Sequence, residues 1–113
     1  MNFRTTQKAD VTVIALDGNM LGVPEGAELN GQLHKLMENG RKQVILDLSA
    51  VGFINSSGLS ALIHSASTLK KSGGRMVVAG ASKKVLELIK VTKLTPLIEA
   101  LPDVGAALDT FPK

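Results

Sequence analysis

The chain has 113 residues, of which 44% are hydrophobic and 20% charged, so we expect one soluble globular domain spanning residues 1–113. The absence of cysteine excludes disulfides and cysteine-ligated zinc, and no apolar run reaches the ~18 residues of a membrane span, which favours a cytoplasmic protein without membrane insertion. The net charge of +3 raises the question of nucleic acid. However, the basic residues are spread along the chain and only three residues are aromatic, so we expect no direct nucleic-acid binding.

The first half of the chain predicts two strands and a helix. Residues 2–6 and 11–16 have strand character and are separated by a short turn, which indicates an antiparallel pair. Residues 17–24 are rich in turn formers and are expected to form a loop. Pro24 suits the first turn of a helix, whose expected buried face is Leu29, Leu33, Leu36 and Met37.

The second half alternates short apolar runs with helical patterns. Strands are expected at 44–48, 75–79 and 97–101, and a helix at 57–71. That helix would bury Leu59, Leu62, Ile63, Ala66 and Leu69. Further helices are expected after Ser82 and after Asp103. This order predicts the α/β class, with a mixed four- to five-stranded β-sheet packed with about four α-helices.

The link that precedes the helix at 57–71 carries the polar residues of most interest. Asn55 stands where a helix N-cap belongs, and the neighbouring apolar residues Ile54 and Leu59 have the spacing of a hydrophobic staple. Ser56 and Ser57 then fall in the first turn, where the helix dipole favours an added anion. Serines and glycines at a helix start also have purely structural uses, so a capping role and a functional role both stay open.

Patterns for catalysis are missing from the sequence. His34 and His64 lie in helical stretches without a nearby acid or nucleophile, and no nucleophile elbow, phosphate loop or zinc-protease motif occurs. We therefore expect a binding module and not an enzyme, with no cofactor and no metal site.

The stretch from 47 to 59 reads Asp-Leu-Ser-Ala-Val-Gly-Phe-Ile-Asn-Ser-Ser-Gly-Leu. It resembles the signature of STAS domains, the family of bacterial anti-sigma factor antagonists, in which a strand ending in Asp-Leu is followed by Asp-Ser-Ser/Thr-Gly-Leu. The similarity continues through residues 73–80 and 85–89 and covers nearly the whole chain. The resemblance implies a single STAS-like domain of the same α/β architecture.

The resemblance also implies a switch. Ser56 matches the serine that is phosphorylated by a partner acting as both anti-sigma factor and serine kinase, and Ser57 is a second, less favoured hydroxyl. An unmodified domain of this kind binds its partner, and the phosphorylated domain dissociates from it.

A partner surface is expected beside the switch. It would combine the loop residues Met20, Leu21 and Val23 with Asn55, Ser56, Ser57, Gly58 and Leu59. The alternative for the three loop residues is that they fold over the sheet as core.

Two positions depart from the usual family pattern. Asn55 replaces an aspartate, and Leu21 stands where many members have an acid in the early loop. Two other functions remain open beside the switch: an unphosphorylated scaffold subunit of a signalling or lipid-transport complex, and nucleotide binding at the N-terminus of the helix after Asn55.

Overall fold

The computed structural model describes residues 2–20, 23–91 and 99–111. The elements in chain order are β1 (Asn2–Lys8), β2 (Val11–Met20), α1 (Val23–Glu38), β3 (Gln43–Ile54), α2 (Ser56–Lys71), β4 (Arg75–Ala79), α3 (Lys83–Val91), β5 (Glu99–Leu101) and α4 (Val104–Asp109). The α/β class is confirmed, with five strands and four helices in the described part of the chain.

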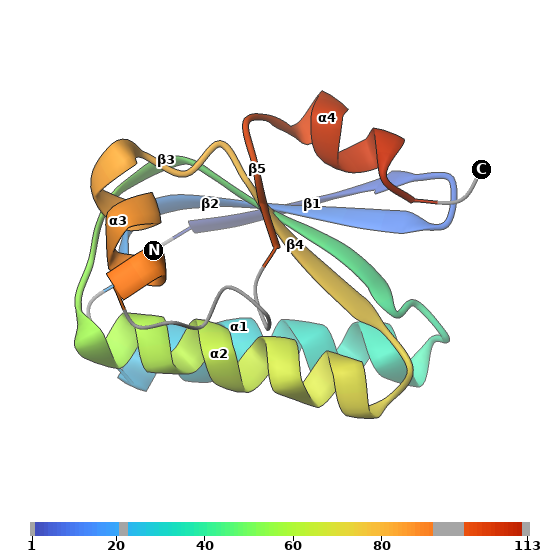
Figure 1. Cartoon of the computed structure of the whole chain (residues 1–113). Coiled ribbons are helices and arrows are strands. Elements are labelled where there is room, and N and C mark those ends of the chain that lie inside the picture. Colours follow the sequence, from blue (N-terminus) through green and yellow to red (C-terminus); the bar gives the residue numbers. More distant parts are fainter. Residues whose placement is uncertain (1, 21–22, 92–98, 112–113) are drawn as a thin grey trace.

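The five strands form one mixed sheet in the order β1-β2-β3-β4-β5. β1 pairs with β2 antiparallel, as the short turn between them predicted, whereas β2, β3, β4 and β5 run parallel. Parallel neighbours need a crossover, and α1 and α2 supply the first two. Both helices lie side by side under the same face of the sheet (Figure 1).

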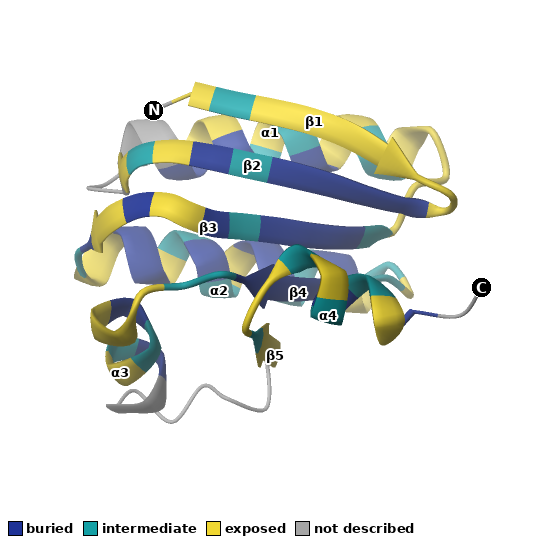
Figure 2. Ribbon diagram, turned by 90° about the horizontal axis from the view of Figure 1, so that it is seen from above, coloured by how far each residue is buried: buried dark blue, intermediate teal, exposed yellow. Residues whose placement is uncertain are grey.

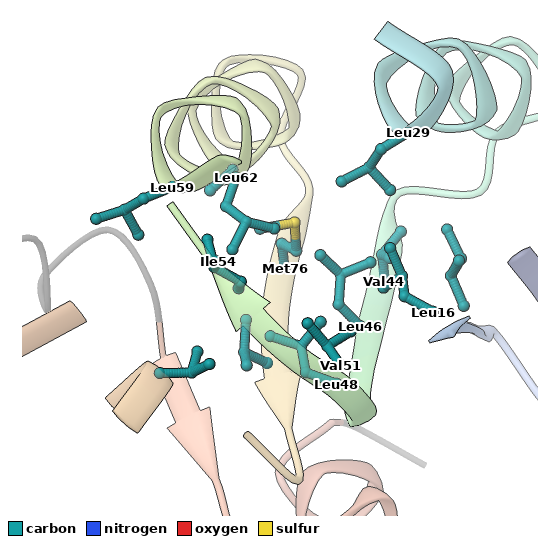
Figure 3. Packing of buried hydrophobic residues seen from close by; sticks show 14 of the residues in the cluster. Leu16, Leu29, Val44, Leu46, Leu48, Val51, Ile54, Leu59, Leu62 and Met76 are labelled. Atoms are coloured by element: carbon teal, nitrogen blue, oxygen red, sulfur yellow. The ribbon is translucent and has the colours of Figure 1, made fainter. Parts of the chain in front are cut away.

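The main hydrophobic core fills the space between the sheet and the helices α1 and α2 (Figure 3). Leu62 is fully buried there, together with Leu29 and Leu33 of α1 and Leu46 of β3. Ile63 is only partly buried, which corrects its assignment to the buried face of α2. Leu36 and Met37 at the end of α1 are likewise partly buried.

A smaller core lies on the opposite face of the sheet. Ile45 and Val77, on the two central strands, meet Ala107 and Phe111 at α4. Figure 2 shows α4 covering this face, while β1 is exposed along most of its length. Residues 44–46 of β3 and 76–79 of β4 are therefore buried on both faces, in keeping with the unbroken apolar runs of their sequences.

Two of the sequence-based boundaries are wrong. β2 continues to Met20 through a stretch predicted as loop, and β3 continues to Ile54 through a stretch predicted as a link. The two extensions pair with each other, with irregularities in register between Ala15 and Asp17 and between Gly18 and Met20. Such irregularities accommodate the turn-forming residues, because a bulge tolerates a residue such as Gly18, whose φ is +119°.

Candidate functional site

The junction of β3 and α2 has the local geometry that the sequence indicates. Asn55 is extended, with φ −92° and ψ −177°, and its side-chain Oδ1 accepts a 2.8 Å hydrogen bond from the backbone N–H of Gly58. Its carbonyl accepts from the N–H of Leu59 at 2.9 Å. Asn55 is therefore the N-cap of α2, as predicted, and the departure from aspartate preserves the cap.

The residues flanking this cap are anchored in the core. Ile54 and Leu59 are each 4% exposed and belong to the same core cluster, at the two positions of a hydrophobic staple (Figure 3). Gly58 is also buried. The buried Ile54 and Leu59 thus fix the path of the backbone into α2, and this sets the orientation of the residues between them.

Ser56 and Ser57 are exposed at the first two positions of α2. Neither faces an acid in the first turn of that helix. An anion here would meet the positive end of the helix dipole, which favours it by about 0.3–1 kcal/mol at an exposed site. The arrangement can therefore accept a negative group without rearranging its own backbone.

A groove of about 300 Å³ runs from this site between the two long helices. It is lined by Gly26, Ala27, Asn30, Ser57, Ala61 and His64. Its floor is shallow because α1 and α2 approach closely: a Cβ on Gly26 would lie 2.5 Å from the Cβ of Ala61. Asn30 Oδ1 is buried and has no hydrogen-bond partner among the described residues. The sequence pattern did not single out this groove.

A second hollow of about 140 Å³ lies on the other side of Asn55, between the end of β3 and α3. It is lined by Gly52, Phe53, Ile54, Lys84, Val85 and Leu88. Phe53 is 52% exposed, the highest exposure of a large apolar side chain in the described part of the chain. The sequence carried a signal for it, since Phe53 alternates with the buried Ile54 along an extended strand.

The expected loop part of the partner surface is only partly described. Leu21 lies outside the described residues, and so do the side chains of Met20 and Val23. Their backbones end β2 and begin α1. Whether these three side chains contact a partner or cover the sheet stays a prediction.

The described residues contain neither a candidate metal site nor a candidate membrane-spanning helix. Within residues 2–20, 23–91 and 99–111, histidine and acidic side chains do not gather in groups of three that could hold a metal ion. None of the helices in the same ranges combines the length and apolar character of a bilayer crossing.

The STAS domain family matches residues 2–107. A relative from Bordetella bronchiseptica, BtrV, named as a candidate anti-sigma factor antagonist, is 24% identical over 95% of this chain and 92% of its own.

Solved structures share the fold. An anti-sigma factor antagonist candidate from Thermotoga maritima superimposes with a TM-score of 0.85 at 18% identity, covering 95% of this chain and 92% of its own. SpoIIAA of Bacillus, solved in its phosphorylated form, gives 0.73 at 17% identity, covering 96% and 97%. The murine anion transporter Slc26a9 gives 0.76 at 19% identity, with 91% of this chain matching 18% of the transporter.

The agreement in fold extends over nearly the whole chain, and the family match includes the Asn-Ser-Ser-Gly-Leu run at the start of α2. The chain belongs to the STAS domain family.

Proposed function

We propose that this protein is an anti-sigma factor antagonist that binds an anti-sigma factor with serine kinase activity and is switched off by phosphorylation of Ser56. The observation that carries the proposal is the exposed Ser56 at the first position of α2, held by the Asn55 cap and the buried Ile54 and Leu59. The names of BtrV and SpoIIAA, and the phosphorylated form of SpoIIAA, support it.

The chemistry of the switch is a single group transfer. The kinase transfers the γ-phosphoryl group of ATP to Ser56 Oγ, so that one P–O bond forms, the bond to the ADP leaving group breaks and the hydroxyl proton is released. The product carries about −1.5 to −2 charges and three acceptor oxygens. This protein remains a binding module, because the reacting groups that drive the transfer belong to the partner.

The surroundings of Ser56 explain why phosphorylation would favour release. The exposed Phe53 lies three residues before Ser56, and the groove beside Ser57 is lined largely by small and apolar side chains. A partner that covers these apolar features removes water from the serine as well. A phosphate inside that contact loses hydration, and the first turn of α2 contains no basic residue that could pair with it.

The test compares partner affinity for wild type, Ser56→Ala, Ser56→Asp and Ser57→Ala by calorimetry, with phosphate incorporation followed by mass spectrometry. Ser56→Ala should bind like unmodified wild type and take up no phosphate. Ser56→Asp should fold, because an acid suits the first turn of a helix, and should bind at least about tenfold more weakly, or ~1.4 kcal/mol. Ser57→Ala is the matched control and should retain phosphorylation.

An unphosphorylated scaffold is the second candidate, favoured by the likeness to part of the Slc26a9 transporter. It predicts equal partner affinities for wild type, Ser56→Ala and Ser56→Asp, and no phosphate on Ser56 from any serine kinase encoded beside the gene. That combination of results would refute the switch. Nucleotide binding at the start of α2 is the remaining alternative, and equilibrium dialysis of the wild-type protein with ATP tests it.

A further inference from the structure

The end of the domain opposite Ser56 gathers basic residues that are far apart in the sequence. The β1–β2 turn, the α1–β3 loop and the α2–β4 loop meet there (Figure 1). Exposed basic residues at this end include Lys8, Lys35, Arg41, Lys42, Lys70 and Lys71. Exposed acids there include Asp10, Glu38 and Asp109, so the balance is positive. The backbones of Lys42 and of Leu69, which directly precedes Lys70, both contact Gly74, so the two basic pairs lie at the same end of the domain.

Capping accounts for only part of this cluster. Lys70 and Lys71 lie in the last turn of α2, where they complement the negative end of the helix dipole. Arg41 and Lys42 lie outside both helices, directly before β3. Arg41 Nη1 donates to Gln7 Oε1 at 3.1 Å, and Lys42 makes no ion pair within the ranges that the structure describes.

These two cations border a hollow of about 360 Å³. It is lined by Asp10, Gly40, Arg41, Lys42, Gln43 and Gly73, and is mostly polar. Two of the lining residues are glycines with positive φ, Gly40 at +74° and Gly73 at +81°, a backbone conformation that favours glycine. The volume is at the lower end of the range for small-molecule pockets.

Gln43 is the unusual member of this lining. It is the first residue of β3 and pairs with Val11 on one side and Arg75 on the other. Its side-chain Oε1 is buried without a hydrogen-bond partner among the described residues. A buried acceptor without a donor is unfavourable, so its retention calls for an explanation.

We infer that this hollow binds a small ligand that carries both phosphate and hydroxyl groups. Arg41 and Lys42 supply the charge for the phosphate. Gln43 Oε1 and the Asp10 carboxylate supply acceptors for the hydroxyl groups, a combination that inorganic phosphate alone would not use. A concave, polar hollow suits a small molecule better than a flat membrane, and the exposed Phe53 that could insert into one lies at the other end of β3.

The site is independent of the switch proposed above, because Ser56 follows the carboxyl end of β3 and the hollow adjoins its amino end. The experiment is a titration of the ¹⁵N-labelled full chain followed by NMR, with ribose 5-phosphate, inorganic phosphate and ribose as separate probes. Vesicles containing phosphatidylinositol phosphate form a fourth arm, read by co-sedimentation. Ribose 5-phosphate should shift the amide signals of residues 10, 40–43 and 73 and leave 56–58 unchanged.

Variants assign the contacts. Arg41→Ala/Lys42→Ala should weaken binding of ribose 5-phosphate at least about tenfold, and Lys83→Ala/Lys84→Ala, an exposed basic pair on α3, is the matched control that should bind as wild type. Gln43→Leu should weaken binding without lowering resistance to urea, which a purely structural glutamine would not do. Binding to vesicles alone would support the site and identify a lipid headgroup as the source of the phosphate.

Three results would overturn the inference. The first is the absence of localised shifts and of vesicle binding for every probe. The second is an equal loss of affinity in Arg41→Ala/Lys42→Ala and Lys83→Ala/Lys84→Ala, which would indicate general charge attraction. The third is unchanged affinity in Gln43→Leu, which would leave the buried acceptor without a ligand.

Discussion

Two glycines of α1 should respond to alanine with opposite signs. Gly31 is exposed, and a Cβ added there would meet nothing within 4 Å. Gly26 is buried, and a Cβ added there would lie only 2.5 Å from the Cβ of Ala61. Alanine is favoured over glycine in a helix by up to about 1 kcal/mol. Gly31→Ala should therefore stabilise the protein by about 0.5–1 kcal/mol. Gly26→Ala gains the same helix preference but must push the two helix backbones apart, and this overpacking costs about 1–3 kcal/mol.

Urea denaturation followed by circular dichroism measures both variants, with the slope of free energy against urea expected to stay constant. The free energies of unfolding should differ by about 1–3 kcal/mol in favour of Gly31→Ala. Adding Ala61→Gly to Gly26→Ala removes the clash, so the double variant should be more stable than the sum of its single changes implies. Equal stabilisation by Gly26→Ala and Gly31→Ala would refute the close contact of α1 and α2.

The remaining predictions concern the core and one ion pair. Leu62→Ala should cost about 2–5 kcal/mol in urea denaturation, and the partly exposed Ile63→Ala clearly less; equal losses would contradict the assigned face. Arg75 binds Glu99 through two hydrogen bonds of 2.9 and 2.6 Å, which lower the pKa of the Glu99 carboxyl below its usual value. The ion pair contributes under about 1 kcal/mol at this exposure, and this stability is present above the unfolded pKa of Glu99 and lost as the pH falls through the folded pKa. In Glu99→Gln, the free energy of unfolding should therefore fall less steeply as the pH is lowered. An unchanged dependence on pH would contradict a role for this ion pair.

Local chemistry explains which features the sequence predicted. The Asn55 cap and the Ile54–Leu59 staple depend on residues within five positions of one another, so the start of α2 could be identified from the pattern alone. The face of α2 followed from its 3.6-residue period, with an error only at Ile63, on the margin of the apolar stripe.

Features that depend on distant pairing were missed. The extensions of β2 and β3 include turn-forming residues such as Gly18 and Gly52, and they become strands because each pairs with the other, which local preference does not report. The hollow beside Gln43 combines three loops from separate parts of the chain, so that Arg41 and Lys42 lie beside Asp10 and Gly73. The groove beside Ser57 similarly requires the spacing of two helices to be known.

The order of the strands also bears on how the chain folds during synthesis. Each described strand lies beside the strand that precedes it in the sequence, so its partner has already left the ribosome when it emerges. The sheet can therefore grow from β1 toward β5 without a gap held open for a later segment. At each stage the growing side of the sheet exposes the edge of the newest strand, while β1 forms the opposite edge, and the three-residue β5 is added last. Growth in this direction limits the time during which the apolar central strands β3 and β4 lack a partner.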